Sequence, residues 1–310
     1  MTDIGRMLLF SHEDCLGHAE PPGHPEQAAR LMAVEQALAG FDLDRRAAPL
    51  AGRDEVLRCH PAGYVAQVEA AVPADGWAML DGDTWLAPGS LTAALRAVGG
   101  VCAAVDAVLA GEAKRAFIAC RPPGHHAETA RAMGFCLFGS VAIAAKRALD
   151  HHRLSRVAVL DFDVHHGNGT QDLLWDESRA MFVSSHEMPL YPGTGAARET
   201  GAHGQVVNLP LRAGSGGAAM RAVWAPALAR VRDFAPDLIL VSAGFDAHAD
   251  DPLASLEWEV EDFRWLTAAI CDLADQVCGG RVVSALEGGY DLPALGASVA
   301  AHVDEMMRRA

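Results

Sequence analysis

The chain has 310 residues, of which 51% are apolar, and a formal net charge of −15. This length suffices for a large core, and we expect one domain over residues 1–310. The charge disfavours nucleic acid and anionic membranes as partners and favours cationic substrates. No apolar run approaches the roughly 20 residues that cross a membrane, and the run Met7–Phe10 is too short for a signal peptide. We therefore expect a soluble, cytoplasmic protein.

The cysteines are odd in number and widely scattered, and no two of them form a C-x-x-C pair. This pattern predicts reduced core residues rather than a disulfide framework or a metal-binding knuckle. The sequence does not fix the oligomeric state and leaves a homo-oligomer open. The seven cysteines are Cys15, Cys59, Cys102, Cys120, Cys136, Cys271 and Cys278.

Short apolar strands, each followed by a loop rich in glycine and functional side chains, alternate with alanine-rich stretches of helical period. Residues 50–90 are less regular and predict loops and short helices around a cleft. The expected helices lie at about 90–110, 139–150, 217–233, 260–277 and 293–308. The clearest strand-and-loop units are 116–128, 156–169, 237–252 and 281–292. This alternation predicts an α/β fold of three layers, α/β/α, with a mainly parallel sheet that binds ligands at the carboxyl ends of its strands.

The stretch "LDFDVHHGNGTQ" (160–171) places polar side chains directly after a buried strand. In an extended segment Asp161, Asp163 and His165 share one face. Buried carboxylates are costly unless a cation offsets their charge, and Asp oxygens with a His nitrogen suit zinc or another divalent transition metal. A structural ion-pair cluster is the alternative, but this stretch contains no Arg or Lys.

A second loop, "SAGFDAHADDP", supplies Asp246 from the same edge of the predicted sheet. Asp163, His165 and Asp246 then make three protein ligands, which leaves coordination positions for water and substrate, as in a catalytic zinc site. We interpret His248 and Asp250 as loop groups near this site.

Two further loops add groups for acid–base chemistry. His125 and His126 follow a Pro-Pro-Gly turn in "RPPGHHAE", at the same sheet edge as the expected metal. The other adjacent pair, His151 and His152, lies at the end of a predicted helix, and we interpret it as a surface pair. Tyr290 in "LEGGYDL" could donate a hydrogen bond to a developing oxyanion, although a half-buried structural tyrosine is the simpler alternative.

With these loops, the chain resembles the zinc-dependent histone deacetylase family of the arginase/deacetylase fold, whose central sheet has about eight strands. The motifs "RPPGHHA", "DFDVHHGNGTQ", "YPGTG", "SAGFDAH" and "EGGYDL" occur in the order typical of that family. The resemblance runs from "GHPEQAARL" (23–31) to the C-terminal helix. It is strongest to class II and bacterial members, including acetylpolyamine amidohydrolases.

The resemblance implies roles for most of these residues. One zinc ion would be held by Asp163, His165 and Asp246. His125, His126 and Tyr290 would be catalytic, and Asp161 would support His125. The resemblance also implies a structural potassium ion bound by Asp161, by main-chain oxygens of Asp163 and His165, and by Ser184 and Ser185.

Class I members place an Asp behind the second histidine, where this chain has Asn168. Without that charge His126 should be less basic. An acyl-lysine tunnel would be lined by Gly134, Phe135 and Tyr191, since aromatic faces can enclose a methylene chain. The alternative for both aromatic residues is a plain core role.

We expect hydrolysis of an acetylated lysine side chain or a small acetylated primary amine, which releases acetate and the free amine. In the polyamine-selective branch of the family, the position of Leu253 resembles a gatekeeper glutamate. Leucine offers no charge to a remote ammonium, so acetyl-lysine should be preferred over acetylspermidine. Asp83 or Glu20 could supply the missing charge, and an acetylpolyamine amidohydrolase is the alternative function.

Two other functions are less consistent with the sequence. An arginase-type ureohydrolase with two manganese ions needs further aspartates where this chain has Gly167 and His248. A non-catalytic module that binds acyl-lysine would be indicated by loss of a catalytic residue, but every such position is filled.

Overall fold

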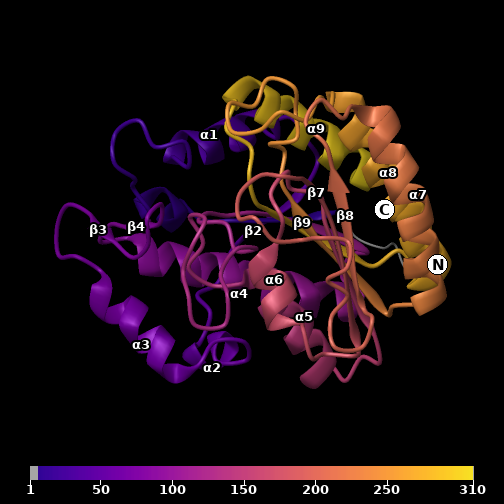
Figure 1. Cartoon of the computed structure of the whole chain (residues 1–310). Coiled ribbons are helices and arrows are strands. Elements are labelled where there is room, and N and C mark those ends of the chain that lie inside the picture. The colour runs from indigo at the N-terminus through magenta and orange to yellow at the C-terminus, as the bar shows by residue number, and fades with distance from the viewer. Residues whose placement is uncertain (1–5, 310) are drawn as a thin grey trace.

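An eight-stranded sheet in which every pair of neighbours is parallel forms the centre of the computed structural model, which describes residues 6–309 (Figure 1). The strand order is β2-β1-β5-β10-β9-β6-β7-β8. The strands are β1 (Leu8–Ser11), β2 (Asp44–Ala47), β5 (Arg115–Ala119), β6 (Val157–Asp161), β7 (Ala180–Glu187), β8 (Val206–Leu211), β9 (Leu238–Ala243) and β10 (Val282–Leu286). The predicted parallel sheet of about eight strands is confirmed.

Helices cover both faces of this sheet and complete the three predicted layers (Figure 1). One face carries α4 (Ser90–Leu109) and α5 (Ser140–Asp150), which pack against each other. The other face carries α1 (Ala28–Ala37), α7 (Gly217–Phe234), α8 (Val260–Val277) and α9 (Leu292–Arg308), each packed on the next in the order α1, α9, α8, α7. The five helices expected from the sequence are confirmed within one or two residues at each end.

The central strands are apolar because both of their faces are covered. Every residue of β5, β6, β9 and β10 is buried, as is usual for parallel strands between two helical layers. The edge strand β2, "DRRA", alternates half-buried and exposed residues and has no apolar run. For that reason the sequence pattern did not single it out.

Helix α4 corrects one expectation. By its length and a mean hydropathy of 1.6, it could cross a membrane, so the statement that no apolar stretch is long enough is wrong for this helix. Inside the protein 67% of that stretch is buried, and α4 packs against β1, β5 and β10. The apolar composition of α4 is that of a core helix, and the cytoplasmic location stays a prediction.

Residues 50–90 form short elements beside the sheet, as expected. They comprise α2 (Arg53–Val56), α3 (Ala62–Ala71) and an antiparallel hairpin of β3 (Ala78–Met79) and β4 (Trp85–Leu86). The cysteines are all free thiols, and each is buried except Cys59, which is half-buried. The prediction of reduced cysteines agrees with this arrangement.

The strand order explains where the functional loops meet. The four strands whose loops carry the motifs are direct neighbours, in the order β5-β10-β9-β6. Their ends are also level, because Ala285 of β10 pairs with Ile118 and Ser242, and Ser242 pairs with Asp161. Four loops from distant parts of the chain therefore leave the sheet side by side.

Candidate active site

Three candidate metal ligands converge at the ends of β6 and β9. Ligand atoms of Asp163, His165 and Asp246 all lie within 4.8 Å of one another. His165 Nδ1 lies 3.1 Å from Asp163 Oδ1 and 3.1 Å from Asp246 Oδ2. Burial opposes a charge on this imidazole, but hydrogen bonds to the two carboxylates raise its pKa to about 10. A metal ion could take the place of a proton between these three groups, since all three donors bind metal in their deprotonated forms.

The surroundings of these carboxylates fit a cation. Their ion-pair partners among residues 6–309 are histidines, and neither Arg nor Lys contacts them. Each carboxylate also accepts a hydrogen bond from a main-chain N–H group. Gly288 N donates to Asp163 Oδ2 (2.8 Å), and Val164 N donates to Asp246 Oδ1 (2.8 Å). A Cβ atom on Gly288 would overlap Asp246 Oδ2, so the glycine leaves room around the donors. The donor set of two oxygens and one nitrogen suits zinc.

The tandem histidines lie beside this group and have different partners. His125 Nδ1 is 3.1 Å from Asp161 Oδ2, and its Nε2 is 3.7 Å from Asp163 Oδ2. Burial lowers the pKa of His125, but Asp163 and Asp161 outweigh it and raise that pKa well above its usual value. His125 therefore has the environment of an imidazolium.

His126 has the opposite environment. Its Nδ1 lies 2.7 Å from Asn168 Oδ1, and the Asn168 amide nitrogen donates to Glu128 Oε1 (2.8 Å). Burial and the neighbouring His125 and His165 lower the pKa of His126 well below its usual value. Since Asn168 accepts at Nδ1, the neutral ring leaves Nε2 as its free proton acceptor.

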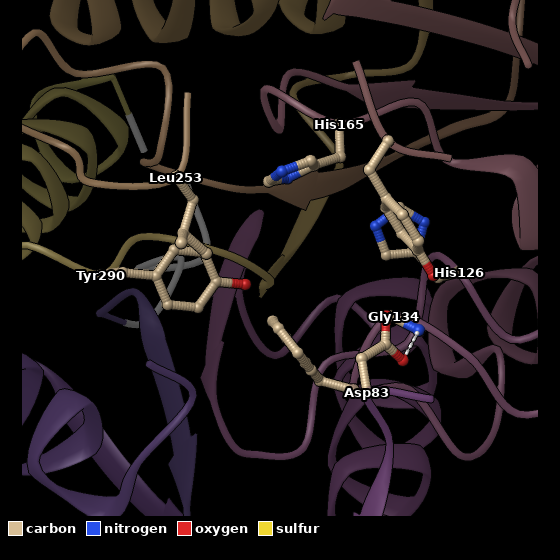
Figure 2. A pocket seen from close by; sticks show the side chains of 8 residues that line it. Asp83, His126, Gly134, His165, Leu253 and Tyr290 are labelled. Carbon is tan, nitrogen blue, oxygen red and sulfur yellow. Dashed lines mark hydrogen bonds between the residues drawn. The ribbon is translucent and has the colours of Figure 1, made fainter. Parts of the chain in front are cut away.

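The side chain of Tyr290 faces this group across a cavity, with its hydroxyl directed into the open space (Figure 2). The Arg30 guanidinium lies 4.8 Å from the centre of the Tyr290 ring, and the Tyr290 main-chain N–H donates to Asp251 Oδ2 (2.7 Å). Burial raises the pKa of the phenol well above its usual value, so the hydroxyl keeps its proton and can act as a donor.

The cavity has a volume of about 220 Å³ and is lined by all four residues that were predicted to contact the substrate. Leu253 and Tyr290 lie on one side and His126, Gly134 and Asp83 on the other (Figure 2). The lining residues are Asp83, His126, Gly134, Phe135, His165, Tyr191, Leu253 and Tyr290. The aromatic rings pack edge to face, with 5.2 Å between the ring centres of His126 and Tyr191 and 6.0 Å between those of Phe135 and Tyr290.

The β3–β4 hairpin supports one wall of the cavity. Gly134 and Phe135 both have positive φ angles, of 56° and 67°, which is unusual for a phenylalanine. Asp83 Oδ1 accepts from Gly134 N (3.0 Å), and Thr84 Oγ1 accepts from Phe135 N (3.2 Å). A Cβ atom on Gly134 would overlap the ring of His126, so only glycine fits there. The hairpin thus holds the turn that brings Phe135 to the cavity.

Of the residues predicted to bind potassium, Asp161, Ser184 and Ser185 lie on the neighbouring strands β6 and β7, whereas Asp163 and His165 follow the end of β6. Ser184 of β7 pairs with Asp161 of β6. The Ser184 hydroxyl is 3.0 Å from His186 Nδ1, and the Ser185 hydroxyl accepts from Trp224 Nε1 (3.0 Å).

Comparisons with known proteins decide the family. The histone deacetylase domain family matches residues 24–306. A histone deacetylase-like amidohydrolase of Pseudomonas aeruginosa is 42% identical over 282 residues, which cover 88% of this chain and 73% of the relative. A probable deacetylase of Archaeoglobus fulgidus is 37% identical, with 92% of this chain and 81% of the relative covered. The chain belongs to the histone deacetylase family.

A solved structure agrees with this assignment. The crystal structure of the HDA15 HD domain superposes with a TM-score of 0.91 at 31% identity, covering 98% of this chain and 89% of that one. The family resemblance and the arginase/deacetylase fold predicted from the sequence are therefore confirmed. As a family member, this protein is a metal-dependent amidohydrolase that removes acetyl groups from acetylated amines.

Several residues at or near the site had no role, or only a minor one, in the sequence analysis. Asp83 was considered only as a possible source of negative charge, and it lies in the cavity wall. The side chain of Glu20 lies 2.7 Å from His18 Nε2, and Glu20 is not among the residues that line the cavity. Asp251 and Glu287 hold the main chain of the loops that carry Tyr290 and His125. The sequence signal for both was a carboxylate next to a motif residue, which does not by itself reveal which main-chain groups it accepts from.

Proposed function

We propose that the protein is a zinc deacetylase with one zinc ion per chain bound by Asp163, His165 and Asp246. The convergence of these three buried donors at a cavity that also presents His126 and Tyr290 carries the proposal. When bound, the metal would polarise the acetyl carbonyl and make a water molecule more acidic. The roles below belong to the side chains of the chain itself.

His126 acts as general base and then as general acid. Its Nδ1 is engaged by Asn168, its pKa is low and it lines the cavity, so a neutral ring can take a proton from water at Nε2. The imidazolium that forms then protonates the leaving amine. Because Asn168 carries no charge, it stabilises this imidazolium less than an aspartate would.

His125 and Tyr290 stabilise charge rather than transfer the main proton. His125 is held as a cation by Asp161 and supports the negative charge that develops beside it. Tyr290 donates its hydroxyl proton in a hydrogen bond to the oxyanion of the tetrahedral intermediate. A structural potassium ion, bound by Asp161, Ser184, Ser185 and main-chain oxygens of Asp163 and His165, would add support to the strand end that carries these groups.

The preferred substrate has a long uncharged stem. Phe135, Tyr191 and Leu253 line the cavity, and among the described lining residues Asp83 is the one carboxylate. Asp83 already accepts a hydrogen bond from Gly134 N, so part of its capacity to accept hydrogen bonds from a substrate is used within the protein. We infer that an acetyl-lysine side chain or another mono-acetylated amine is preferred over an acetylated polyamine.

The two-manganese ureohydrolase is opposed by packing as well as by sequence. A Cβ atom on Gly167 would overlap Asp161 Oδ2, so the aspartate that a second metal needs at this position has no room. His248 lies outside the group of converging donors, and its Nδ1 accepts from Asp250 N (3.1 Å).

The test is a substrate screen of the purified protein with and without a metal chelator. Acetyl-lysine peptides, acetylated polyamines and other small N-acetyl amines would be compared by release of acetate. We expect hydrolysis that is lost with the chelator and restored by Zn²⁺. Full activity after removal of all transition metal would refute the proposed mechanism.

A further inference from the structure

Glu287 is a buried carboxylate at the active site that none of the roles above uses. It is the first residue after β10, and only 1% of its surface is exposed. It lies outside the group of converging metal donors. An ionised side chain buried at this depth is costly unless hydrogen bonds or charges compensate it.

The partners of Glu287 come from two other loops and strands. Its Oε2 accepts from Gly124 N (2.7 Å) and from His125 N (3.2 Å). Its Oε1 accepts from the Ser242 hydroxyl on β9 (3.0 Å). The main-chain oxygen of Glu287 accepts from Arg30 Nη2 (2.5 Å), and this bond holds the main chain from which the side chain extends. Both carboxylate oxygens therefore accept hydrogen bonds. One of them, Oε2, binds the main chain of the loop that carries His125 and His126, which we call the tandem-histidine loop.

The tandem-histidine loop has little other freedom to adjust. A Cβ atom on Gly124 would lie 2.7 Å from Ser140 Oγ, so the main chain is closely packed on its far side. The side chain of His125 is held from β6 by Asp161, while its main-chain N–H is held from β10 by Glu287. His126 follows directly, so its place relative to the metal donors depends on the same anchor.

We propose that Glu287 is a positioning residue, which sets the place of His125 and His126 by accepting from the main chain of their loop. This inference rests on the proposed function, in which both histidines act on the substrate. Among the described residues, the side chain of Glu287 bonds to the loop and to Ser242, and Glu287 is not one of the cavity-lining residues, so its effect passes through the histidine loop. Both bonds to the loop go to one carboxylate oxygen, so we expect the reach of this oxygen to matter more than the charge of the side chain.

Two substitutions separate reach from charge. Glu287→Gln keeps the length and an oxygen that can accept from Gly124 and His125, while its amide can donate to the Ser242 hydroxyl oxygen. Glu287→Asp keeps the charge but is shorter by one methylene group, so its oxygens cannot reach the loop from the same main-chain position. Ser242→Ala is the matched control, because it removes one partner of Glu287 and leaves the bonds to the loop.

The experiment compares the parent and the three variants by steady-state kinetics on an acetyl-lysine peptide, by metal content and by hydrogen exchange of segment 121–128. For Glu287→Asp we expect about 100-fold lower kcat, since small misplacements of catalytic groups have effects of this size. KM and the metal content should stay within about threefold of the parent, and exchange in 121–128 should be faster with and without zinc. Glu287→Gln and Ser242→Ala should stay within a few-fold of the parent in kcat and exchange.

Two results would overturn the proposal. Parent-like kcat and exchange in Glu287→Asp would show that the loop does not depend on this oxygen. A loss of kcat in Glu287→Gln as large as that in Glu287→Asp, or larger, would show that the reach of the carboxylate oxygen is not what positions the loop. Failure of the proposed function would look different, since the parent itself would then lack chelator-sensitive deacetylation while the exchange of 121–128 would still report on the anchor.

Discussion

Residues 6–309 contain two groups of three histidine or carboxylate donors whose ligand atoms lie within 4.8 Å of one another. One is the Asp163, His165 and Asp246 group at the cavity. The other, which we call the inner group, consists of His18, Glu20 and Glu26. Donor spacing alone does not distinguish the two.

Their cationic neighbours distinguish them. In the inner group, Glu26 Oε1 accepts from Arg30 Nη1 (2.8 Å) and Arg121 Nε (2.7 Å), and Oε2 accepts from Arg121 Nη2 (2.5 Å). Burial would raise the pKa of Glu26, but the two guanidinium groups lower it to about 2. The inner group is therefore already neutralised by side chains, whereas the cavity group has no Arg or Lys partner. A buried donor cluster indicates a metal site where the protein supplies no cation of its own.

The largest expected effect comes from removing one donor of the cavity group. Asp246→Asn should lose the metal and with it the deacetylase activity, because one of the two anionic ligands becomes neutral while Val164 N keeps an acceptor. Elemental analysis should find about one equivalent of transition metal in the parent and far less in the variant. Glu20→Gln in the inner group is the control and should keep the metal. Two tightly bound metals in the parent, or loss of metal in Glu20→Gln, would contradict the contrast between the groups.

The inner group should instead act on stability. Glu26→Gln leaves Arg30 and Arg121 buried without their anion, which typically costs about 3–5 kcal/mol in the free energy of unfolding. Urea denaturation at neutral pH would measure this loss, and the metal content of the folded fraction should not change. An unchanged stability would show that water or another acceptor replaces the carboxylate.

The same ion pair predicts a dependence on pH. The pKa of Glu26 is lowered on folding, so its contribution is complete above the unfolded value of about 4.5 and is lost as the pH falls toward 2. The parent should lose stability over this range more steeply than Glu26→Gln, which has no charge to lose. Denaturation curves at several pH values between about 5 and 2 would measure the two slopes.

Arg30 connects the inner group to the cavity wall, because it binds Glu26 and also lies over the ring of Tyr290. Tyr290→Phe keeps the ring and this contact but removes the hydroxyl that faces the cavity. We expect kcat to fall about 10²- to 10³-fold, which corresponds to about 3–4 kcal/mol of transition-state stabilisation, with little change in KM. The control is Tyr64→Phe, since the Tyr64 hydroxyl donates to Leu137 O away from the cavity (2.6 Å). A Tyr290→Phe variant within a few-fold of the parent would show that the hydroxyl does not reach the oxyanion.

The sequence predicted the layers and the helices because their patterns are local. Apolar runs mark β5, β6, β9 and β10, and helical periodicity marks α4, α5, α7, α8 and α9. The polar edge strand β2 and the hairpin of β3 and β4 lack such runs, since each is stabilised by its neighbours rather than by its own burial pattern. Helix α4 shows that an apolar pattern can also mislead, because length and hydropathy do not reveal whether protein or membrane covers a helix.

The sequence could place the motif residues at one edge of the sheet, because parallel strands end together. It could not identify the residues that hold the loops carrying these motifs. Asp163, His165 and Asp246 follow strands that the sequence identifies. Glu287 and Asp83 act through main-chain N–H groups of loops that are distant in the chain. Such contacts depend on the strand order β5-β10-β9-β6 and on the position of the β3–β4 hairpin, and the sequence pattern specifies neither.

The smallest expected effect lies at the cavity wall, at a residue that belongs to neither donor group. Leu253 is half-buried there, on the side of Tyr290, and its main-chain N–H donates to Asp251 Oδ1 (3.0 Å). Leu253→Glu would place a carboxylate where a remote ammonium of a polyamine could approach it. Partly exposed charge pairs contribute only about 0.2–1 kcal/mol, so we expect the ratio of kcat/KM for N8-acetylspermidine to that for an acetyl-lysine peptide to rise about two- to fivefold.

Leu253→Gln is the control for this change, because it has similar size and reach without the charge. The gain in Leu253→Glu should also shrink at high salt, since an exposed charge pair is screened. If the parent already prefers the polyamine, or if Gln and Glu give the same ratio, position 253 does not select the substrate by charge. Asp83 would then be the remaining carboxylate in the cavity wall that could recognise a second cationic nitrogen.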